Sequence, residues 1–291
     1  MKFVKMHGAG NDYVVIDAWE EAVPRPGAVA RRMCHRRFGV GADGLILLLP
    51  PAKRKAGGRG QADLRMRMFN PDGSEAEMCG NGIRCLGKLA CDLGRVRTRE
   101  FRVETKAGVR LLRLLRARGR TAWLEVTMGK PVLERAAIPV ARGEGPRLGE
   151  RLRVAGWDLA VHCLSVGNPH CVIFLRDLGW KRPLAEFPVG DVGPQVERHP
   201  FFPRRTNVEF VEVASPARIR LRTWERGAGE TLACGTGAVA AAAAGMLRGW
   251  LKRKVVVEVL GGRLQVRWPE GREAFLTGPA ETVFRGEWLG G

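Results

Sequence analysis

Short runs of apolar residues, several of them alternating with polar ones, recur along the whole chain. Runs of this length bounded by Gly, Pro, Asn and Asp are typical of strands. The predicted strands are residues 3–7, 13–17, 45–49, 64–69, 100–105, 109–115, 122–127, 160–166, 171–175, 208–213, 218–223, 255–260, 263–268 and 273–276. We therefore expect a chain rich in β-structure, with a tight hairpin turn at Gly261–Gly262.

Helical patterns are fewer, and they occur at residues 28–37, 82–93 and 236–248. The third of these segments is rich in alanine and apolar on every face. A helix of this kind has to be surrounded by protein, and in a strand-rich chain the simplest surround is a curled sheet. Residues 183–203 are rich in proline and predict a loop.

One cysteine motif occurs twice, each time at the start of a predicted helix. Residues 79–82 read Cys-Gly-Asn-Gly, and residues 234–237 read Cys-Gly-Thr-Gly. A helix N-terminus favours a thiolate and offers free main-chain N–H groups to an anion. The two motifs lie about half a chain apart, and each follows a Glu and is flanked by strands. This arrangement predicts an internal duplication with two similar domains.

Two such thiols suggest paired acid and base chemistry. If two domains face each other across a cleft, the thiolate of one cysteine could remove a proton from a carbon. The thiol of the other could then return a proton to the opposite face, which inverts a stereocentre without a cofactor. Negative charge that develops on a neighbouring carboxylate would need preorganised N–H donors. These donors would come from Gly80, Asn81, Gly235 and Thr236.

Each motif also has a structural interpretation, because buried cysteine is common and glycine can serve only a tight turn. The spacing of the cysteines contains no Cys-x-x-Cys pair, so a zinc site or thioredoxin-like chemistry is not expected. The Gly-rich residues 39–44 precede a predicted strand rather than a helix, which argues against a nucleotide-binding loop. We expect the remaining cysteines to pack in the core: Cys34, Cys85, Cys91, Cys163 and Cys171.

Composition and charge narrow the setting. The 291 residues carry a formal charge of +19, which could attract nucleic acid. No nucleic-acid motif accompanies the charge, and Tyr13 is the only tyrosine, so a solvated Arg-rich surface is favoured. The basic residues 50–61 are expected to form a surface loop of unassigned role. An odd number of cysteines and a start without a long apolar run favour free thiols in the cytoplasm, and no apolar stretch is long enough to span a membrane.

Six segments resemble the signatures of diaminopimelate epimerases. Residues 72–85 resemble the first cysteine signature of that family, and residues 225–237 resemble the second. The other similar segments are residues 3–12, 38–44, 167–170 and 206–210. The six occur in family order over nearly the whole chain, so the match is highly specific.

The resemblance implies an α+β fold of two pseudo-symmetric domains, each a curved, barrel-like mixed β-sheet wrapped around a central helix. Residues 1–127 would form the first domain, completed by a C-terminal strand within residues 279–291, and residues 128–278 would form the second. The active site would lie in the cleft between them, and its closure would exclude water from the thiols.

The implied activity is the epimerisation of LL-2,6-diaminopimelate to meso-diaminopimelate, in the synthesis of lysine and peptidoglycan precursors. The enzyme would be a cytoplasmic isomerase that uses neither pyridoxal phosphate nor a metal nor any other cofactor. Its partner would be a small-molecule substrate rather than nucleic acid or a membrane, and it could form a homodimer.

The resemblance also implies roles for individual residues. Cys79 and Cys234 would be the two bases. The reacting end of the substrate would be held by Asn11 together with Gly80, Asn81, Gly235 and Thr236. The distal end would be recognised by Asn70, Asn168, Asn207 and Arg226, because amides and a forked guanidinium suit a zwitterion. Glu225 would accept an ammonium group, and His170 and Glu225 are candidates for assisting proton transfer. Each Asn beside Pro or Asp could instead be only a turn residue.

One position departs from the family pattern. Many relatives carry Gln where this chain has Gly44, so a side-chain contact near the substrate is missing, and water or a main-chain group could replace it.

Three alternatives stay open. A related two-cysteine amino-acid racemase, such as a proline racemase-like enzyme, shares the chemistry. A basic RNA-binding protein with structural cysteines fits the charge. A redox switch could use a disulfide between Cys79 and Cys234.

Overall fold

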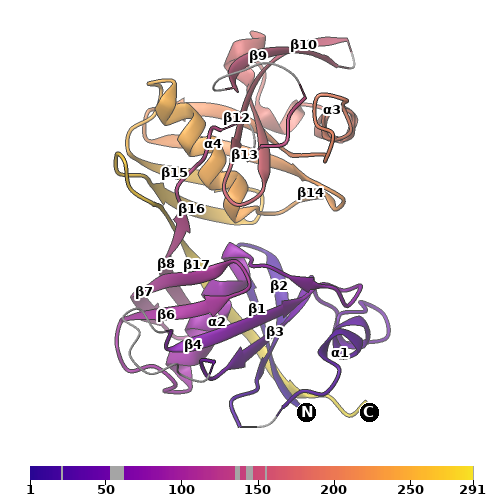
Figure 1. Ribbon diagram of the computed structural model, residues 1–291, viewed down its shortest axis with the longest axis vertical. Helices are drawn as coiled ribbons and strands as arrows, with labels where there is room; N and C mark the ends of the chain where they lie inside the picture. The colour runs from indigo at the N-terminus through magenta and orange to yellow at the C-terminus, as the bar shows by residue number, and fades with distance from the viewer. Residues whose placement is uncertain (21, 53–61, 135–137, 142–146, 155, 291) are drawn as a thin grey trace. The chain divides into compact units, whose positions relative to one another are not determined.

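The contacts within the chain divide it into two compact units (Figure 1). The computed structural model describes all residues except 21, 53–61, 135–137, 142–146, 155 and 291. Unit 1 comprises Met1–Thr127 and Thr277–Gly291, and unit 2 comprises Met128–Leu276. Most of the basic segment 50–61 therefore lies outside the described residues.

Unit 1 begins with a β-hairpin, and its described residues contain two helices. Its elements are β1 (Lys2–Gly8), β2 (Asn11–Asp17), α1 (Pro26–Met33), β3 (Gly44–Leu49), β4 (Leu64–Phe69), β5 (Glu75–Ala76), α2 (Gly80–Asp92), β6 (Glu100–Thr105), β7 (Gly108–Arg118) and β8 (Thr121–Gly129). The C-terminal part of β17 (Ala274–Glu287) pairs antiparallel with β1.

Unit 2 has the same plan with additional outer elements. These elements are β9 (Arg147–Val154), β10 (Trp157–Ser165), β11 (Pro169–Phe174), η2 (Leu175–Leu178), η3 (Leu184–Glu186), α3 (Val189–Glu197), β12 (Asn207–Ser215), β13 (Arg218–Glu225), β14 (Gly229–Thr231), α4 (Gly235–Leu247), β15 (Lys254–Val259) and β16 (Gly262–Arg267).

The two units repeat one topology strand for strand. In unit 1, β1–β2 is antiparallel, β2–β3 parallel, β3–β4 antiparallel, β4–β6 parallel and β6–β7 antiparallel. In unit 2, the pairs β10–β11, β11–β12, β12–β13, β13–β15 and β15–β16 follow the same alternation. A short strand, β5 or β14, leads into the Cys-Gly helix each time. The predicted duplication is therefore confirmed.

Each unit wraps its sheet around one central helix (Figure 1). Helix α2 contacts β1, β2, β3 and β7, and α4 contacts β10–β13, β15 and β16. Helix α4 is buried at Gly235 and from Gly237 to Met246, as its all-apolar pattern predicts. Small residues let strands approach closely: a Cβ added at Gly87 would lie 2.7 Å from Leu112 Cδ2. The predicted fold class is confirmed.

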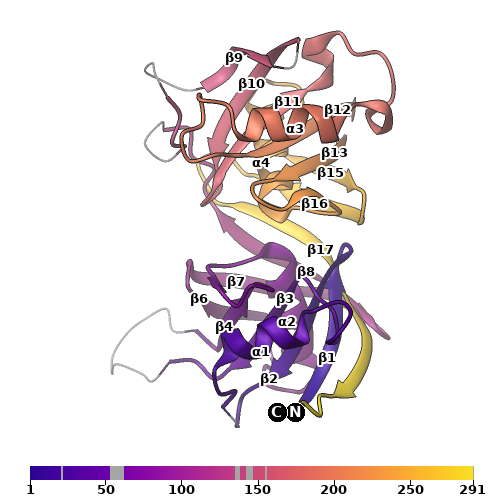
Figure 2. The same ribbon diagram turned by 90° about the vertical axis from the view of Figure 1, so that its right-hand side faces the viewer.

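A second layer covers the outer face of each sheet. In unit 1, α1 packs with Val14 and Ile16 of β2 and Leu45 of β3, whereas Tyr13 faces α2 because neighbouring side chains on a strand alternate. In unit 2, α3 and α4 lie on opposite faces of the sheet (Figure 2). Among the described residues, no helix is both long and apolar enough to cross a bilayer.

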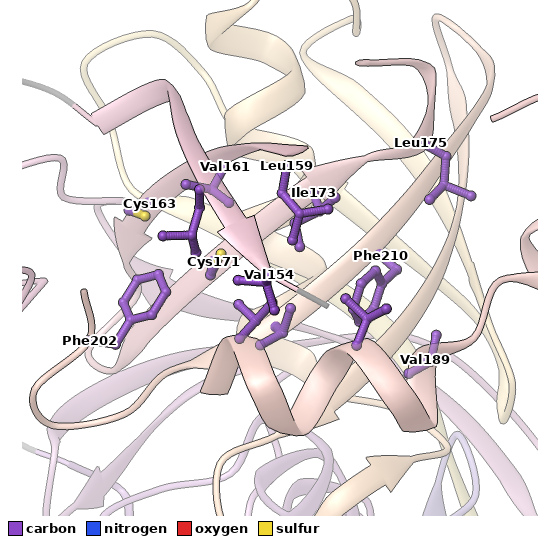
Figure 3. Close-up of a cluster of buried hydrophobic side chains, with 14 of the residues drawn as sticks. Val154, Leu159, Val161, Cys163, Cys171, Ile173, Leu175, Val189, Phe202 and Phe210 are labelled. Atoms are coloured by element: carbon purple, nitrogen blue, oxygen red, sulfur yellow. The ribbon is translucent and has the colours of Figure 1, made fainter. Parts of the chain in front are cut away.

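The loop predicted for residues 183–203 is wrong, because α3 lies within it. Val189, Val192 and Val196 form one apolar face that packs on Phe210 and other side chains of β9–β12 (Figure 3). Pro194 lies inside this helix, where proline removes one main-chain donor. Burial of the valine face outweighs that cost. Strand β9 is not among the predicted strands, because Arg and Glu break up its apolar pattern.

Candidate active site

Cys79 is the N-cap residue of α2, with an extended backbone at φ −130° and ψ 128°. The helix starts directly after it, since Ile83 N donates to Cys79 O at 2.9 Å. The main-chain N–H groups of Gly80, Asn81 and Gly82 belong to the first turn of this helix, directly after the thiol-bearing residue.

The Cys79 thiol lies in a small hydrogen-bonded cluster with side chains of β2 and α2. Its Sγ is 3.0 Å from the Tyr13 hydroxyl and 3.7 Å from Asn11 Oδ1. The Tyr13 hydroxyl also donates to Asn11 Oδ1, and Asn81 Nδ2 donates to the same oxygen at 3.4 Å. The structure thus brings together the predicted site residues Cys79, Gly80, Asn81 and Asn11.

A network of charged side chains holds Asn11 from the other side. Asn11 Nδ2 donates to Asp43 Oδ2 at 2.6 Å, and Arg36 Nη2 bridges Asp43 at 2.6 Å and Asp12 at 3.0 Å. Burial alone would raise the pKa of Asp12, but hydrogen bonds from Lys5 and Arg36 lower it on balance. The Asn11 amide is therefore fixed in orientation before any ligand binds.

A fully buried Arg84 lies beneath the start of α2. Its Nη1 donates to Gly80 O at 2.9 Å and its Nη2 to Asn81 Oδ1 at 2.8 Å. Burial lowers the pKa of Arg84. This guanidinium adds positive charge next to the N–H groups of the helix start, an arrangement that suits a carboxylate.

Cys234 occupies the matching N-cap position of α4, at φ −111° and ψ 115°. Its Sγ accepts from Gly237 N at 3.4 Å and lies 3.4 Å from Thr236 Oγ1. Burial, followed by the charges of Glu225 and Glu209, raises the pKa of Cys234 well above its usual value, against these two hydrogen bonds. At Cys234, burial and the two neighbouring carboxylates therefore outweigh the two hydrogen bonds that favour the thiolate.

A buried histidine–carboxylate pair lies next to Cys234. His170 Nδ1 is 2.8 Å from Glu209 Oε1, and its Nε2 is 2.9 Å from Asn168 Oδ1. Burial raises the pKa of Glu209 although His170 opposes this shift. A Cβ added at Gly237 would lie 2.7 Å from Glu209 Oε1 and 3.3 Å from Cys234 Sγ. This position therefore requires glycine.

The residues predicted to read the distal end fall in both units. In unit 2, Asn207 Nδ2 donates to Pro169 O at 3.0 Å, and its Oδ1 accepts from Arg226 N at 2.9 Å. Glu225 Oε1 accepts from Thr231 Oγ1 at 2.6 Å. Asn70 belongs to unit 1, where its Nδ2 donates to Ser74 Oγ at 3.0 Å within a turn.

Tyr13, Arg84 and Glu209 are not among the predicted site residues. Arg84 and Glu209 carried a signal in the sequence, since each is a charged residue inside an apolar segment. All seven cysteines are free thiols, and Cys91 is half-buried whereas Cys34, Cys85, Cys163 and Cys171 are buried. No cluster of three His, Cys, Asp or Glu residues in the described parts of the chain is arranged to hold a metal ion.

Comparison with known proteins identifies the family. A family model described as diaminopimelate epimerase matches residues 3–134 and 162–283. This chain belongs to the diaminopimelate epimerase family. It is 53% identical over 290 residues to the diaminopimelate epimerase of Moorella thermoacetica, and 43% identical over 288 residues to that of Methanococcus maripaludis, covering 99% of both chains each time. The predicted resemblance, and with it the prediction of an isomerase, is confirmed.

Solved structures share the fold of this epimerase family. A probable proline racemase from Agrobacterium radiobacter superposes with a TM-score of 0.68 at 17% identity, over 99% of this chain and 92% of that one. A phenazine biosynthesis protein of the PhzF family from Bacillus anthracis gives 0.66 at 18% identity, over 99% of both chains. At this identity the likeness concerns the fold alone.

Proposed function

We propose that this chain interconverts LL-2,6-diaminopimelate and meso-diaminopimelate without a cofactor, using Cys79 and Cys234 as its two acid–base groups. The observation that carries the proposal is their equivalence. Each is the N-cap of the central helix in one of two topologically identical units, in a chain of the diaminopimelate epimerase family.

The proposed reaction moves one proton off the α-carbon and another onto it. The C–H bond breaks as a thiolate takes the proton, and the bonding electron pair is delocalised into the adjacent carboxylate. The thiol of the other cysteine then delivers its proton to the opposite face. Each turnover exchanges the roles of the two sulfurs, so no net acid or base is consumed.

The charge on the carboxylate has to be stabilised while the proton is absent. We assign this task to the main-chain N–H groups of Gly80, Asn81, Gly235 and Thr236 at the two helix starts, with Asn11 orienting the reacting end. Donors already fixed in place cost no reorganisation in the transition state. The buried Arg84, hydrogen-bonded to Gly80 and Asn81, adds positive charge at one of the two helix starts.

The raised pKa of Cys234 suggests which sulfur starts as the acid. A raised pKa favours the protonated form of Cys234, which places this sulfur to donate, and we assign the abstraction of the proton to Cys79. His170, paired with Glu209, and Glu225 are the proposed assistants in moving protons at this end. Once the proton has been transferred, Cys79 is the thiol and Cys234 the thiolate, which is the state that the return reaction requires.

The distal amino-acid group would be read by Asn70, Asn168, Asn207, Glu225 and Arg226. The Arg226 guanidinium suits a carboxylate and Glu225 an ammonium group, because opposite charges compensate each other's desolvation. The homodimer and the cytoplasmic location predicted from the sequence stay predictions.

The substrate assignment is tested by incubation in deuterated water with LL-diaminopimelate and, in parallel, with L-proline. We expect the meso form to appear with deuterium at the inverted α-carbon, and no exchange into proline. If proline exchanged its α-proton and racemised while diaminopimelate did not react, the protein would instead have a proline racemase-like activity.

A further inference from the structure

The repeated topology places Tyr13 and His170 at the same position of their units. Tyr13 follows Asn11 by two residues in β2, and His170 follows Asn168 by two residues at the start of β11. The Tyr13 hydroxyl hydrogen-bonds to Asn11 Oδ1, and His170 Nε2 lies 2.9 Å from Asn168 Oδ1. Unit 1 thus carries a phenol where unit 2 carries an imidazole.

Two glycines lie against the Tyr13 ring, which is fully buried. Gly44 pairs with Tyr13 across β2 and β3, and a Cβ there would lie 3.6 Å from Tyr13 Cδ1 and 3.0 Å from Phe69 O. A Cβ at Gly82 of α2 would lie 3.4 Å from Tyr13 Cζ. Many relatives carry Gln at the position of Gly44, and here the groups nearest to an added Cβ are the main-chain oxygen of Phe69 at 3.0 Å and Met68 Cε at 3.3 Å, with the Tyr13 ring at 3.6 Å.

The hydroxyl of Tyr13 has one proton and two neighbours. It lies 3.0 Å from Cys79 Sγ and also reaches Asn11 Oδ1. When Cys79 is a thiol, its S–H can donate to the phenol oxygen while the O–H donates to Asn11. When Cys79 is a thiolate, the O–H can turn to the sulfur, and Asn11 Oδ1 retains the amide donor of Asn81 at 3.4 Å.

We propose that Tyr13 is a positioning residue for Cys79. The Tyr13 hydroxyl donates a hydrogen bond to the Cys79 thiolate and accepts one from the Cys79 thiol. The proton stays on the phenol oxygen throughout, so Tyr13 neither gains nor loses charge. The hydrogen bond is a property of the free protein. Its consequence for turnover rests on the proposed function.

The surroundings of Tyr13 favour a neutral phenol. Burial, and then the neighbouring Cys79, raise the pKa of Tyr13 well above its usual value. The charged or titratable groups that face this cluster are Arg84 and Cys85 from α2 and Asp43 from the segment before β3. In the described part of the chain the Tyr13 hydroxyl hydrogen-bonds to Asn11 and Cys79 and to none of these three groups, so Tyr13→Phe isolates the hydroxyl.

The first test compares wild type with Tyr13→Phe by alkylation with iodoacetamide over a range of pH. Mass spectrometry of the Cys79 peptide gives the rate at each pH, and half-buried Cys91 at the other end of α2 reports local opening. A hydrogen bond to a charged group justifies an expected upward move of the Cys79 midpoint of about one pH unit. The Cys91 profile should not change, and an unchanged Cys79 midpoint would overturn the proposal.

A second test needs no substitution in the gene. Because Tyr13 is the only tyrosine, biosynthetic 3-fluorotyrosine labels this site alone and makes its phenol a stronger donor. The Cys79 midpoint should then move to lower pH, opposite to Tyr13→Phe. The single fluorine resonance should follow the same midpoint and lose that step in Cys79→Ser. A fluorine signal indifferent to Cys79 would contradict the proposal even if Tyr13→Phe failed to fold.

The two proposals fail separately in these measurements. Alkylation requires no substrate, so shifted midpoints in a protein without epimerase activity would retain the role of Tyr13 and reject the function. Full epimerase activity of the wild type, together with an unmoved Cys79 midpoint in Tyr13→Phe, would retain the function and reject the role of Tyr13.

Discussion

At the scale of single residues, the two helix-capping cysteines differ in their neighbours. Cys79 is next to a phenol and two amides, whereas Cys234 is buried beside the carboxylates of Glu209 and Glu225. These unequal surroundings would favour the proton on Cys234 when the two sulfurs share one proton.

A substitution at Gly237 tests how closely the surroundings of Cys234 are packed. An alanine methyl there would meet Glu209 Oε1 at 2.7 Å and Cys234 Sγ at 3.3 Å, so Gly237→Ala should displace the sulfur. We expect epimerase kcat to fall about a hundredfold, since small misplacements of reacting groups cost rates of that order. The matched control is Gly190→Ala in α3, where a Cβ meets nothing within 4 Å. Equal activity of both variants would contradict the proposed role of this packing.

The sequence predicted some site residues better than others for a physical reason. Cys79, Cys234 and their glycines form local motifs, and a motif can be read without knowing the fold. The Tyr13–Cys79 contact joins residues 66 positions apart, and it depends on how the fold packs β2 against α2. A lone tyrosine in an apolar strand carries no trace of that contact.

At the scale of elements, hydrophobic patterning was informative wherever one burial pattern ran through a whole element. The apolar sequence of α4 predicted both a helix and its enclosure by strands. Patterning failed for α3, because the prolines of this segment predicted a loop in spite of its valine face. It also failed for β9, whose charged sequence does not indicate a strand, although β9 pairs with β10.

The valine face of α3 should account for the stability of that helix in spite of Pro194. Val192 is 1% exposed and packs in the cluster of Figure 3. Val192→Ala should lower the free energy of unfolding by about 2 kcal/mol, as expected for a buried side chain truncated by two methyl groups. Gln195→Ala, at an exposed position of the same helix, should change it by less than about 0.5 kcal/mol. Denaturant titration of both variants would refute this account if the two losses were equal.

At the scale of the whole molecule, the chain has seven cysteines, and we propose a chemical role for two of them. Burial raises the pKa of Cys34 and of Cys85 to about 12, so these thiols stay protonated in the folded protein at alkaline pH. In the unfolded chain they ionise near their ordinary pKa of about 8.5.

This difference predicts a loss of stability at high pH. A pKa that is raised in the folded state means that the unfolded chain binds fewer protons above pH about 8.5, so the free energy of unfolding falls as pH rises. Each such thiol contributes up to about 1.4 kcal/mol per pH unit. Urea titrations between pH 8 and 10 should show a shallower decline in Cys34→Ala and Cys85→Ala, whereas Val14→Ala, which removes no thiol, should lower stability with an unchanged slope. Identical slopes in all of these variants would refute this assignment.

The central claim is that Cys79 and Cys234 act as a pair on one α-carbon, and deuterium transfer to LL-diaminopimelate tests it most directly. In deuterated water the wild type should form the meso isomer with solvent deuterium at the inverted carbon. Cys79→Ala and Cys234→Ala should each abolish this inversion while keeping the melting temperature of the wild type within a few degrees. Inversion at the wild-type rate by either variant, or a meso product without solvent deuterium, would contradict the account.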